Sequence, residues 1–475
     1  MSPRISPGLC ERCVHARKIV SAKSSVFWRC ATSERVPGWP KYPPLPVLRC
    51  PHHRAGLPSA GVQRHDATVM NEPAAPDSQP WIELEERFAA HNYHPLDVVL
   101  TRGEGPWVWD VQGKRYLDCL AAYSAVNQGH NHPRIVAALI EQAKILGLTS
   151  RAFRNDKFGP FCRKLSELSG YERVLMMNTG AEAVETAIKA ARKWGYEVKG
   201  VPAGKAKILV CEGNFHGRTT TIVGFSTDPG ARDNYGPFTP GFEVIPYGDL
   251  AAAKAAFDEH VVAVLVEPVQ GEGGIIIPPA DYLPGLRALC DEHQSLLLCD
   301  EIQSGLGRCG SMFAHSLAGV RADGVTIGKA LSGGLYPVSA FLADAKVMDV
   351  FTPGSHGSTY GGNPLACAVA DAALDVLVDE KLVERSAELG AWMKTELENI
   401  ASPHIKELRG VGLWYGIELH PEAGGARRFC EALQREGMLC KETHEHTIRL
   451  APPLVVERAE LEWALARLTK VLGGN

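Results

Sequence analysis

The chain has 475 residues, 45% of them hydrophobic, and a formal net charge of −4. It is long enough to bury a large core in two or more domains. No apolar run approaches the ~18 residues that a membrane-spanning helix requires, and the first residues lack the apolar stretch of a secretory signal. Most cysteines stand singly in apolar segments, which is typical of reduced thiols. We therefore expect a cytoplasmic protein without a membrane partner, whose buried thiols include Cys119, Cys211, Cys290, Cys299 and Cys367.

The first seventy residues differ from the rest in charge. They contain eleven Lys or Arg and three Asp or Glu, which gives +8, so the remaining residues carry −12. A Cys-x-x-Cys pair followed by two further cysteines can hold a tetrahedral zinc ion. The alternatives are an extension that takes no part in the function and a basic segment that contacts nucleic acid, which we favour least. The candidate zinc ligands are Cys10, Cys13, Cys30 and Cys50, with His52 or His53 as substitutes.

From about residue 80 the chain alternates short apolar runs with stretches of helical periodicity, which predicts an α/β fold. The expected strands are 208–210, 262–266, 296–299 and 324–327, and the expected helices are 133–146, 181–194 and 283–293. In the last hundred residues we expect strands at 408–419 and 447–451 and helices at 426–436 and 457–471. This pattern predicts a large central domain and a smaller one built from both ends. The predicted parts are 1–75 (extension and linker), 76–130 (start of the small domain and entry to the large one), 131–370 (large domain) and 371–475 (rest of the small domain).

Loops next to these elements carry residues suited to binding. Asn178-Thr179-Gly180-Ala181 precedes a helix, where small residues let backbone N–H groups approach a phosphate; ordinary helix capping is the alternative. After the strand near residue 210, Phe215 can stack on a planar ring, and Arg218 can grip a carboxylate with its planar guanidinium. The next strand ends at Glu267, and Glu272 follows in a glycine-rich loop, where both carboxylates could equally be solvated.

Lys329 and Asp300 together suggest covalent chemistry. Lys329 lies among small and apolar neighbours, which lower the pKa of an ammonium and free the amine as a nucleophile toward a carbonyl. Asp300 ends an apolar run, where a carboxylate is out of place unless it meets a cation. The pair suggests a Schiff-base lysine and an aspartate that holds a protonated pyridine nitrogen, as in a pyridoxal phosphate (PLP) site. Taken singly, each residue is more simply explained by a structural role than by a catalytic one.

Two other patterns are weaker. The segment 305–310 matches the Gly-x-Gly-x-x-Gly dinucleotide motif, but its glycines neither follow a strand directly nor open a helix. The segments 130–132 and 444–446 each hold two histidines without a convincing set of partner ligands. We interpret them as loop histidines and expect no metal in this part of the chain.

The motifs occur together and in the order found in a known family. Over about residues 80–472 the chain resembles the class III aminotransferases, which are PLP-dependent enzymes of fold type I with a mostly parallel central sheet. Within the class it is most similar to the branch that uses ornithine. Besides the lysine and aspartate motifs, the segments that carry the resemblance are 91–96, 123–130, 149–153, 190–196, 332–340 and 449–454.

The resemblance implies a role for each motif at the cofactor. Lys329 would form the Schiff base and later move a proton, while Asp300 would pair with the pyridine nitrogen. Thr359 would reach the phosphate of the neighbouring subunit's cofactor, so a homodimer or a larger homo-oligomer is expected. The implied cofactor-binding residues are Gly180, Ala181, Phe215, Glu267, Asp300, Gln303, Lys329 and Thr359.

The resemblance also implies two substrates that react in turn at one lysine. The δ-amine of L-ornithine would be removed first, and 2-oxoglutarate would then become glutamate. Tyr93 and Arg218 would hold the carboxylate distal to the reacting end in both cases, and Tyr123 would be a further substrate-binding residue. Arg449 would bind the α-carboxylate of 2-oxoglutarate, and Glu272 would neutralise that arginine when ornithine is bound. The product, glutamate 5-semialdehyde, would cyclise to pyrroline-5-carboxylate.

Two alternatives stay open. One is a related ω-aminotransferase that uses N-acetylornithine, 4-aminobutyrate or lysine, with Tyr93 as the discriminating residue. The other is a protein of the same fold that acts chiefly through residues 1–70 as a metal-binding or nucleic-acid-binding regulator. His216 stands where some relatives carry tryptophan, and we expect it to leave the chemistry unchanged.

Overall fold

The computed structural model describes residues 16–20, 26–30 and 77–473. The chain divides into two compact units, Met1–Ala74 and Ala75–Asn475. In the described part of the first unit, β1 (Ala16–Val20) pairs antiparallel with β2 (Val26–Cys30). The finer domain boundaries stay a prediction. The candidate zinc ligands that lie outside the described residues are Cys10, Cys13, Cys50, His52 and His53.

The second unit is built on a seven-stranded sheet in the order β6-β12-β11-β10-β9-β7-β8. Strand β12 runs antiparallel to its two neighbours, and the remaining neighbours pair parallel. The predicted mostly parallel central sheet is therefore confirmed. Its strands are β6 (Arg173–Met177), β7 (Lys207–Cys211), β8 (Phe242–Ile245), β9 (Val261–Val266), β10 (Leu296–Asp300), β11 (Gly324–Ile327) and β12 (Ser339–Ala343).

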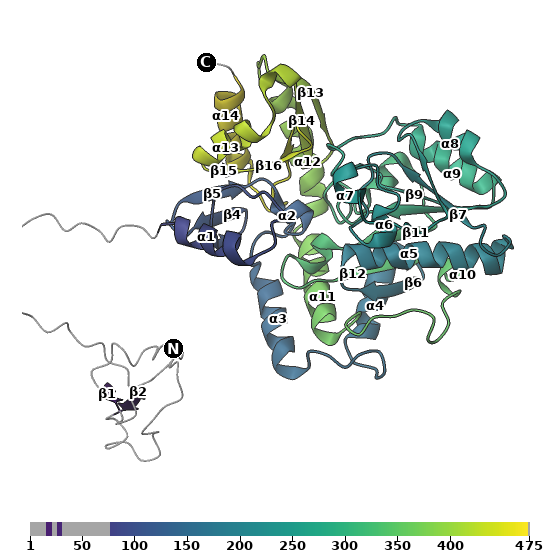
Figure 1. Ribbon diagram of the computed structural model, residues 1–475, viewed down its shortest axis with the longest axis horizontal. Coiled ribbons are helices and arrows are strands. Elements are labelled where there is room, and N and C mark those ends of the chain that lie inside the picture. The colour runs from purple at the N-terminus through teal and green to yellow at the C-terminus, as the bar shows by residue number, and fades with distance from the viewer. Residues whose placement is uncertain (1–15, 21–25, 31–76, 474–475) are drawn as a thin grey trace, which may run out of the picture. The chain divides into compact units, whose positions relative to one another are not determined.

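Apolar residues on both faces of the central strands explain the helices on either side. Successive side chains of a strand point to opposite faces, so Leu297 and Leu298 in β10 belong to different core clusters. Helix α5 (Gly180–Trp194) covers one face, where its Ile188 shares a cluster with Leu298. Helix α9 (Tyr282–Glu292) covers the other, and Figure 1 shows the two helices on opposite sides of β7 and β9. Strand ends in such a sheet are well placed to carry a site.

The unit also contains two four-stranded sheets, in the orders β13-β14-β17-β16 and β15-β5-β4-β3. Strand β15 pairs parallel with β5, so segments near the two ends of this unit share a sheet. Their strands are β3 (Leu100–Glu104), β4 (Trp107–Asp110), β5 (Arg115–Asp118), β13 (Ile405–Gly410), β14 (Tyr415–Leu419), β15 (Met438–Leu439), β16 (Lys441–Thr443) and β17 (Thr447–Leu450).

The prediction of one strand over 408–419 is wrong. Strands β13 and β14 form an antiparallel hairpin instead. The turn contains Gly412 with φ of +58°, and a Cβ there would lie 2.5 Å from the carbonyl oxygen of Arg308. Glycine is therefore required both for the backbone conformation and for the close approach.

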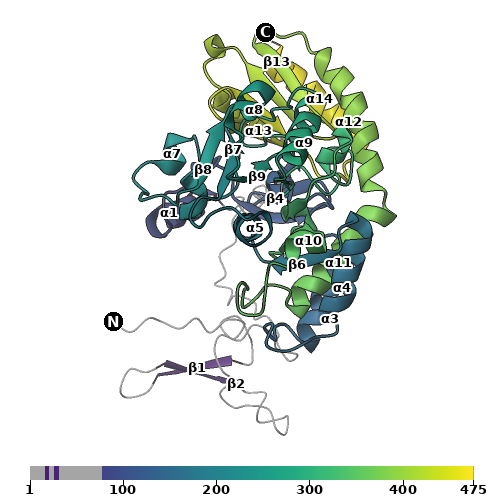
Figure 2. The same cartoon turned by 90° about the vertical axis from the view of Figure 1, so that its right-hand side faces the viewer.

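The predicted helices are confirmed to within two residues at each end. Their C-terminal members, α13 and α14, pack against each other, and α14 also contacts α12 (Figure 2). No helix in the described ranges is long and apolar enough to cross a membrane. Besides α5 and α9, the helices are α1 (Gln79–Phe88), α2 (Ala121–Ser124), α3 (Pro133–Ile145), α4 (Phe158–Ser169), α6 (Thr220–Val223), α7 (Pro229–Arg232), α8 (Leu250–Ala256), α10 (Ala345–Met348), α11 (Pro364–Asp379), α12 (Leu382–Glu398), α13 (Arg427–Arg435) and α14 (Arg458–Leu472).

Candidate active site

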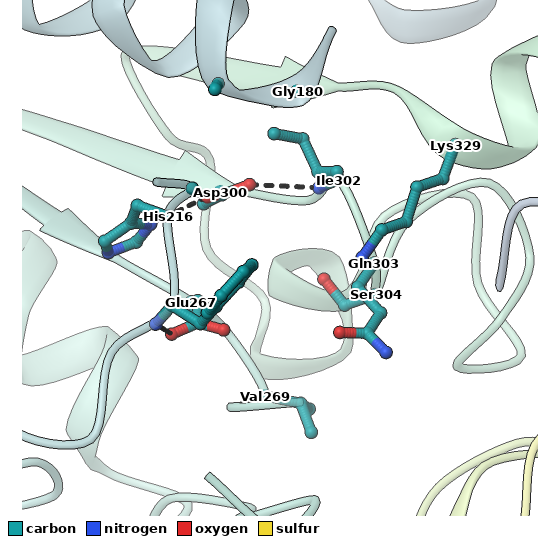
Figure 3. A pocket seen from close by; sticks show the side chains of 12 residues that line it. Gly180, His216, Glu267, Val269, Asp300, Ile302, Gln303, Ser304 and Lys329 are labelled. Atoms are coloured by element: carbon teal, nitrogen blue, oxygen red, sulfur yellow. Dashed lines mark hydrogen bonds and ion pairs between the residues drawn. The ribbon is translucent and has the colours of Figure 1, made fainter. Parts of the chain in front are cut away.

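Most of the predicted cofactor residues line one cavity of about 200 Å³. They come from different elements: Asp300 ends β10, Glu267 follows β9, and Lys329 follows β11. Because these strands are parallel, their C-terminal ends meet at one edge of the sheet. Figure 3 shows Lys329 extending into the space that Asp300 and Glu267 border. The predicted residues that line the cavity are Gly180, Ala181, Phe215, Glu267, Asp300, Gln303 and Lys329.

Lys329 has the environment of a nucleophilic amine. It opens a short 3-10 turn, Lys329–Ser332, in the left-handed conformation with φ of +44°. Burial lowers the pKa of its ammonium, and the nearby Glu272 opposes that shift only in part. Among the described residues, no hydrogen bond or ion pair holds its Nζ. The amine is therefore free to meet a carbonyl carbon.

Asp300 is buried and fixed by three partners. Its Oδ1 accepts hydrogen bonds from the Thr326 hydroxyl at 3.0 Å and from the backbone N–H of Ile302 at 3.1 Å. Its Oδ2 lies 2.7 Å from His216 Nδ1. A carboxylate has further acceptor capacity, so Asp300 can also bind a cationic N–H in the cavity.

The contact between His216 and Asp300 was missed by sequence reasoning, which expected His216 to leave the chemistry unchanged. The imidazole is fully buried, and its Nε2 has no partner within the described part of the chain. Burial opposes protonation of this ring, but Asp300 raises its pKa above the usual value. Nearby, burial raises the pKa of Glu267 to about 7. The contact of His216 with Asp300 was not apparent from the sequence, because His216 lies in a loop far along the chain from the strand that Asp300 ends.

The N-terminus of α5 leaves backbone donors facing the cavity. Thr179 and Glu182 form a capping box, in which the Thr179 hydroxyl accepts from Glu182 N at 3.3 Å and Glu182 accepts from Thr179 N at 2.9 Å. The capping interpretation is thus correct, and it leaves the N–H groups of Gly180 and Ala181 available. A Cβ on Gly217 would lie 2.9 Å from the Ala181 Cβ, so only glycine lets that loop approach the helix. Such a helix start suits a phosphate.

Two further groups fit a planar ligand beside these donors. Gln303 lines the cavity with a buried Nε2 that has no partner among the described residues. Phe215 also lines the cavity, and its backbone N–H donates to Glu267 Oε2 at 3.0 Å. A ring that carries a phosphate, a polar substituent and a protonated nitrogen would match the helix start, Gln303 and Asp300 in turn.

A second predicted group comes together close to the cavity. Arg449 donates to Glu272 through two parallel bonds of 2.8 and 2.9 Å, and only 1% of the arginine side chain is exposed. Its guanidinium lies 5.0 Å from the centre of the Tyr123 ring. Burial tends to raise the pKa of Glu272, but Arg449 outweighs burial and lowers it. Both Glu272 and Arg449 act electrostatically on Lys329, so the pair lies within reach of the amine.

Three predicted residues are exposed in the single chain and do not line the cavity. Tyr93 is 73% exposed, although it contributes to the raised pKa of Tyr123 and is therefore near it. Arg218 is exposed, with its guanidinium 5.4 Å from the centre of the Phe215 ring. Thr359 is exposed as well. Their roles stay predictions.

Known proteins with this arrangement identify the family. The Aminotransferase class-III family profile matches residues 88–472. The chain therefore belongs to the class III aminotransferases, and the predicted family and fold type I architecture are confirmed.

Individual relatives are more specific. An ornithine aminotransferase from Bordetella pertussis is 58% identical over 389 residues, which cover 82% of this chain and 94% of the relative. The solved ornithine aminotransferase from Toxoplasma gondii has a TM-score of 0.82 and 46% identity, covering 83% of this chain and 94% of its own. An acetylornithine aminotransferase from Elizabethkingia anophelis has a TM-score of 0.76 and 48% identity, covering 84% and 99%.

Proposed function

We propose that this aminotransferase transfers the δ-amino group of L-ornithine to 2-oxoglutarate, giving glutamate 5-semialdehyde and glutamate. The observation that carries the proposal is the bidentate pair between Glu272 and Arg449 beside Lys329. The names of relatives at 58% and 46% identity support the same substrate.

PLP is the cofactor that the cavity fits. When bound, it supplies an electron sink for the bond changes at the substrate carbon. Asp300 would hold the pyridine nitrogen, and the Gly180 and Ala181 N–H groups would hold the phosphate. Gln303 Nε2, which lacks a partner among the described residues, would donate to the ring hydroxyl.

Asp300 and Lys329 then have separate roles in the reaction. Asp300 is positioned by His216 and can accept a hydrogen bond from a protonated nitrogen in the cavity. Lys329 supplies the nucleophilic amine, and its Nζ later carries a proton to or from the reacting carbon. Burial lowers the pKa of the Lys329 ammonium and so favours the neutral amine that both tasks need.

Glu272 and Arg449 let one site accept two different substrate ends. Ornithine presents an uncharged methylene chain near its δ-amine, so Arg449 is best kept paired with Glu272 in that half-reaction. The oxo acid presents an α-carboxylate, which can replace Glu272 on the arginine fork. Tyr93 and Arg218 would hold the distal carboxylate of either substrate.

We also propose a homodimer, with Thr359 reaching the phosphate of the partner's cofactor. Its exposure in the single chain is compatible with a place at a subunit contact. A cytoplasmic location is proposed as well, on the ground that single buried cysteines such as Cys119 and Cys211 suit a reducing compartment.

N-acetylornithine is the second candidate donor, since an acetylornithine aminotransferase is 48% identical to this chain. A half-reaction screen separates the two. The PLP-loaded enzyme is mixed in turn with ornithine, N-acetylornithine, 4-aminobutyrate and lysine, and loss of the cofactor band at about 400–430 nm is followed. We expect ornithine to react fastest. A faster reaction with N-acetylornithine would replace the proposed substrate.

A further inference from the structure

Arg308 is a buried arginine for which the proposed chemistry has no use. It lies in the glycine-rich segment 305–310, and its side chain is fully buried. It donates to the carbonyl oxygens of Leu413 at 2.8 Å and Pro452 at 2.7 Å, and to Asn127 Oδ1 at 2.5 Å. Within the described ranges, no carboxylate pairs with it. Burial lowers the pKa of this guanidinium to about 10.

A buried cation that meets only neutral acceptors is a poor source of stability, because desolvation opposes the gain from its hydrogen bonds. The importance of Arg308 therefore lies in the segments that its hydrogen bonds connect. Asn127 lies four residues after Tyr123, and Pro452 lies three residues after Arg449. Arg308 thus bridges the two segments that carry the substrate-facing tyrosine and arginine.

Other bonds join the same two segments on either side of this bridge. The Ala451 N–H donates to the Cys119 carbonyl at 2.7 Å, and the Leu454 N–H donates to the Asn127 carbonyl at 2.8 Å. The segments 119–127 and 449–454 are therefore held together along their length. Among these contacts, the guanidinium of Arg308 is the only charged hydrogen-bonding group.

The first segment needs such support, because its backbone is strained. All four residues of Ala121–Ser124 have positive φ, between +46° and +70°, and none is glycine. Left-handed turns of this kind persist only where the surrounding structure holds them. The turn presents the Tyr123 ring to the Arg449 guanidinium at 5.0 Å.

We propose that Arg308 is a positioning residue, which sets Arg449 and Tyr123 for the α-carboxylate of the oxo acid and so determines the affinity for that substrate. This inference rests on the proposed function, in which Arg449 serves the oxo acid but not ornithine. Arg308 touches neither substrate; it acts through the two tied segments.

Three variants of the PLP-loaded enzyme test the assignment: Arg308→Met, Arg308→Lys and Asn127→Ala. Each is measured in the ornithine half-reaction, in the 2-oxoglutarate half-reaction, and for equilibrium binding of glutarate, a dicarboxylate that cannot react. Lys199→Met is the matched control. Its ammonium also donates to neutral acceptors, at 2.6 Å to Val261 O, 2.7 Å to His293 O and 3.0 Å to Ser295 Oγ, in a region that carries none of the site residues.

We expect Arg308→Met and Asn127→Ala to raise the dissociation constants of glutarate and 2-oxoglutarate by about 10- to 100-fold, with the ornithine half-reaction changed less than about threefold. Arg308→Lys should recover part of the loss, since an ammonium can still bind two carbonyls. Lys199→Met should lower the melting temperature and leave the ratio of the two half-reactions unchanged.

Equal losses in both half-reactions, or an unchanged glutarate affinity in a folded variant, would overturn the proposal. If Arg308→Met does not fold, Arg308→Lys and Asn127→Ala carry the test. If the wild-type enzyme does not react with ornithine in the half-reaction, that result would refute the proposed donor instead. The glutarate affinities of variant and wild type would still decide the role of Arg308.

Discussion

Replacing Glu272 by glutamine tests how one site accepts two substrates. The change keeps the shape of the side chain and removes the charge that now pairs with Arg449 through bonds of 2.8 and 2.9 Å. The oxo acid must displace that carboxylate before its own can bind. Glu272 is 30% exposed, so solvent screens the pair in part. We take about 1.4 kcal/mol as the free energy of displacement, which is tenfold in a dissociation constant.

The expected result is a divergence between the half-reactions. In Glu272→Gln, the dissociation constant of 2-oxoglutarate should fall about tenfold, because no ion pair has to be broken. The rate of the ornithine half-reaction at low substrate should fall by about the same factor, since Arg449 is then a buried charge without a partner. Stopped-flow spectroscopy of each half-reaction gives both values.

The pH dependence sharpens this test. Burial would raise the pKa of Glu272, but Arg449 lowers it on balance. The contribution of a carboxylate with a lowered pKa is present above its ordinary range and is lost only at acidic pH. The effect of Glu272→Gln should therefore be constant from about pH 6 to 9. As a matched control, Asp323→Asn removes an ion pair with Arg287 of 2.6 Å remote from the site, and should affect both half-reactions alike. A parallel change of both half-reactions in Glu272→Gln would refute the reasoning.

Other predictions concern single residues. Lys329→Ala should retain no borohydride-reducible bond to PLP, and detection of such a bond by mass spectrometry would rule out the assigned nucleophile. Tyr93→Phe should weaken ornithine use about tenfold more than 2-oxoglutarate use, because the oxo acid is also held by Arg449 at its second carboxylate, whereas ornithine has only one carboxylate. Equal losses would rule out the role of Tyr93 in recognising the donor. Burial raises the pKa of Glu267 from 4.5 to about 7, so the folded state loses stability as pH rises through that window and levels off above it. Glu267→Gln should therefore stabilise the apoprotein at pH 8 by about 3 kcal/mol but not at pH 4, as urea unfolding can measure; a constant difference would contradict the shift.

The central strands were predictable because their residues are apolar without interruption. Every residue of β9, β10 and β11 is buried, and a strand covered on both faces reads as a continuous apolar run. Three strands of this sheet were missed. Strands β6 and β8 lie at the edges of the sheet and are partly exposed, whereas β12 is buried throughout but is short and contains Ser339 and two alanines, so it does not form a long apolar run. The hairpin at 405–419 read as one strand because apolar residues continue through its turn.

The site was predictable where a residue is chemically out of place in its own segment. Lys329 among small residues and Asp300 at the end of an apolar run are such cases. The contacts of His216 and Arg308 could not be foreseen, since they join positions 84 to 181 residues apart. Only the fold brings those segments together.

The origin of the transferred nitrogen tests the central claim most directly. Ornithine labelled with ¹⁵N at the δ-amine is incubated with the PLP-loaded enzyme and unlabelled 2-oxoglutarate, and the glutamate formed is analysed by mass spectrometry. We predict that the glutamate carries the label and that ornithine labelled only at the α-amine gives unlabelled glutamate. Labelled glutamate from the α-amine, or no glutamate from ornithine, would contradict the account.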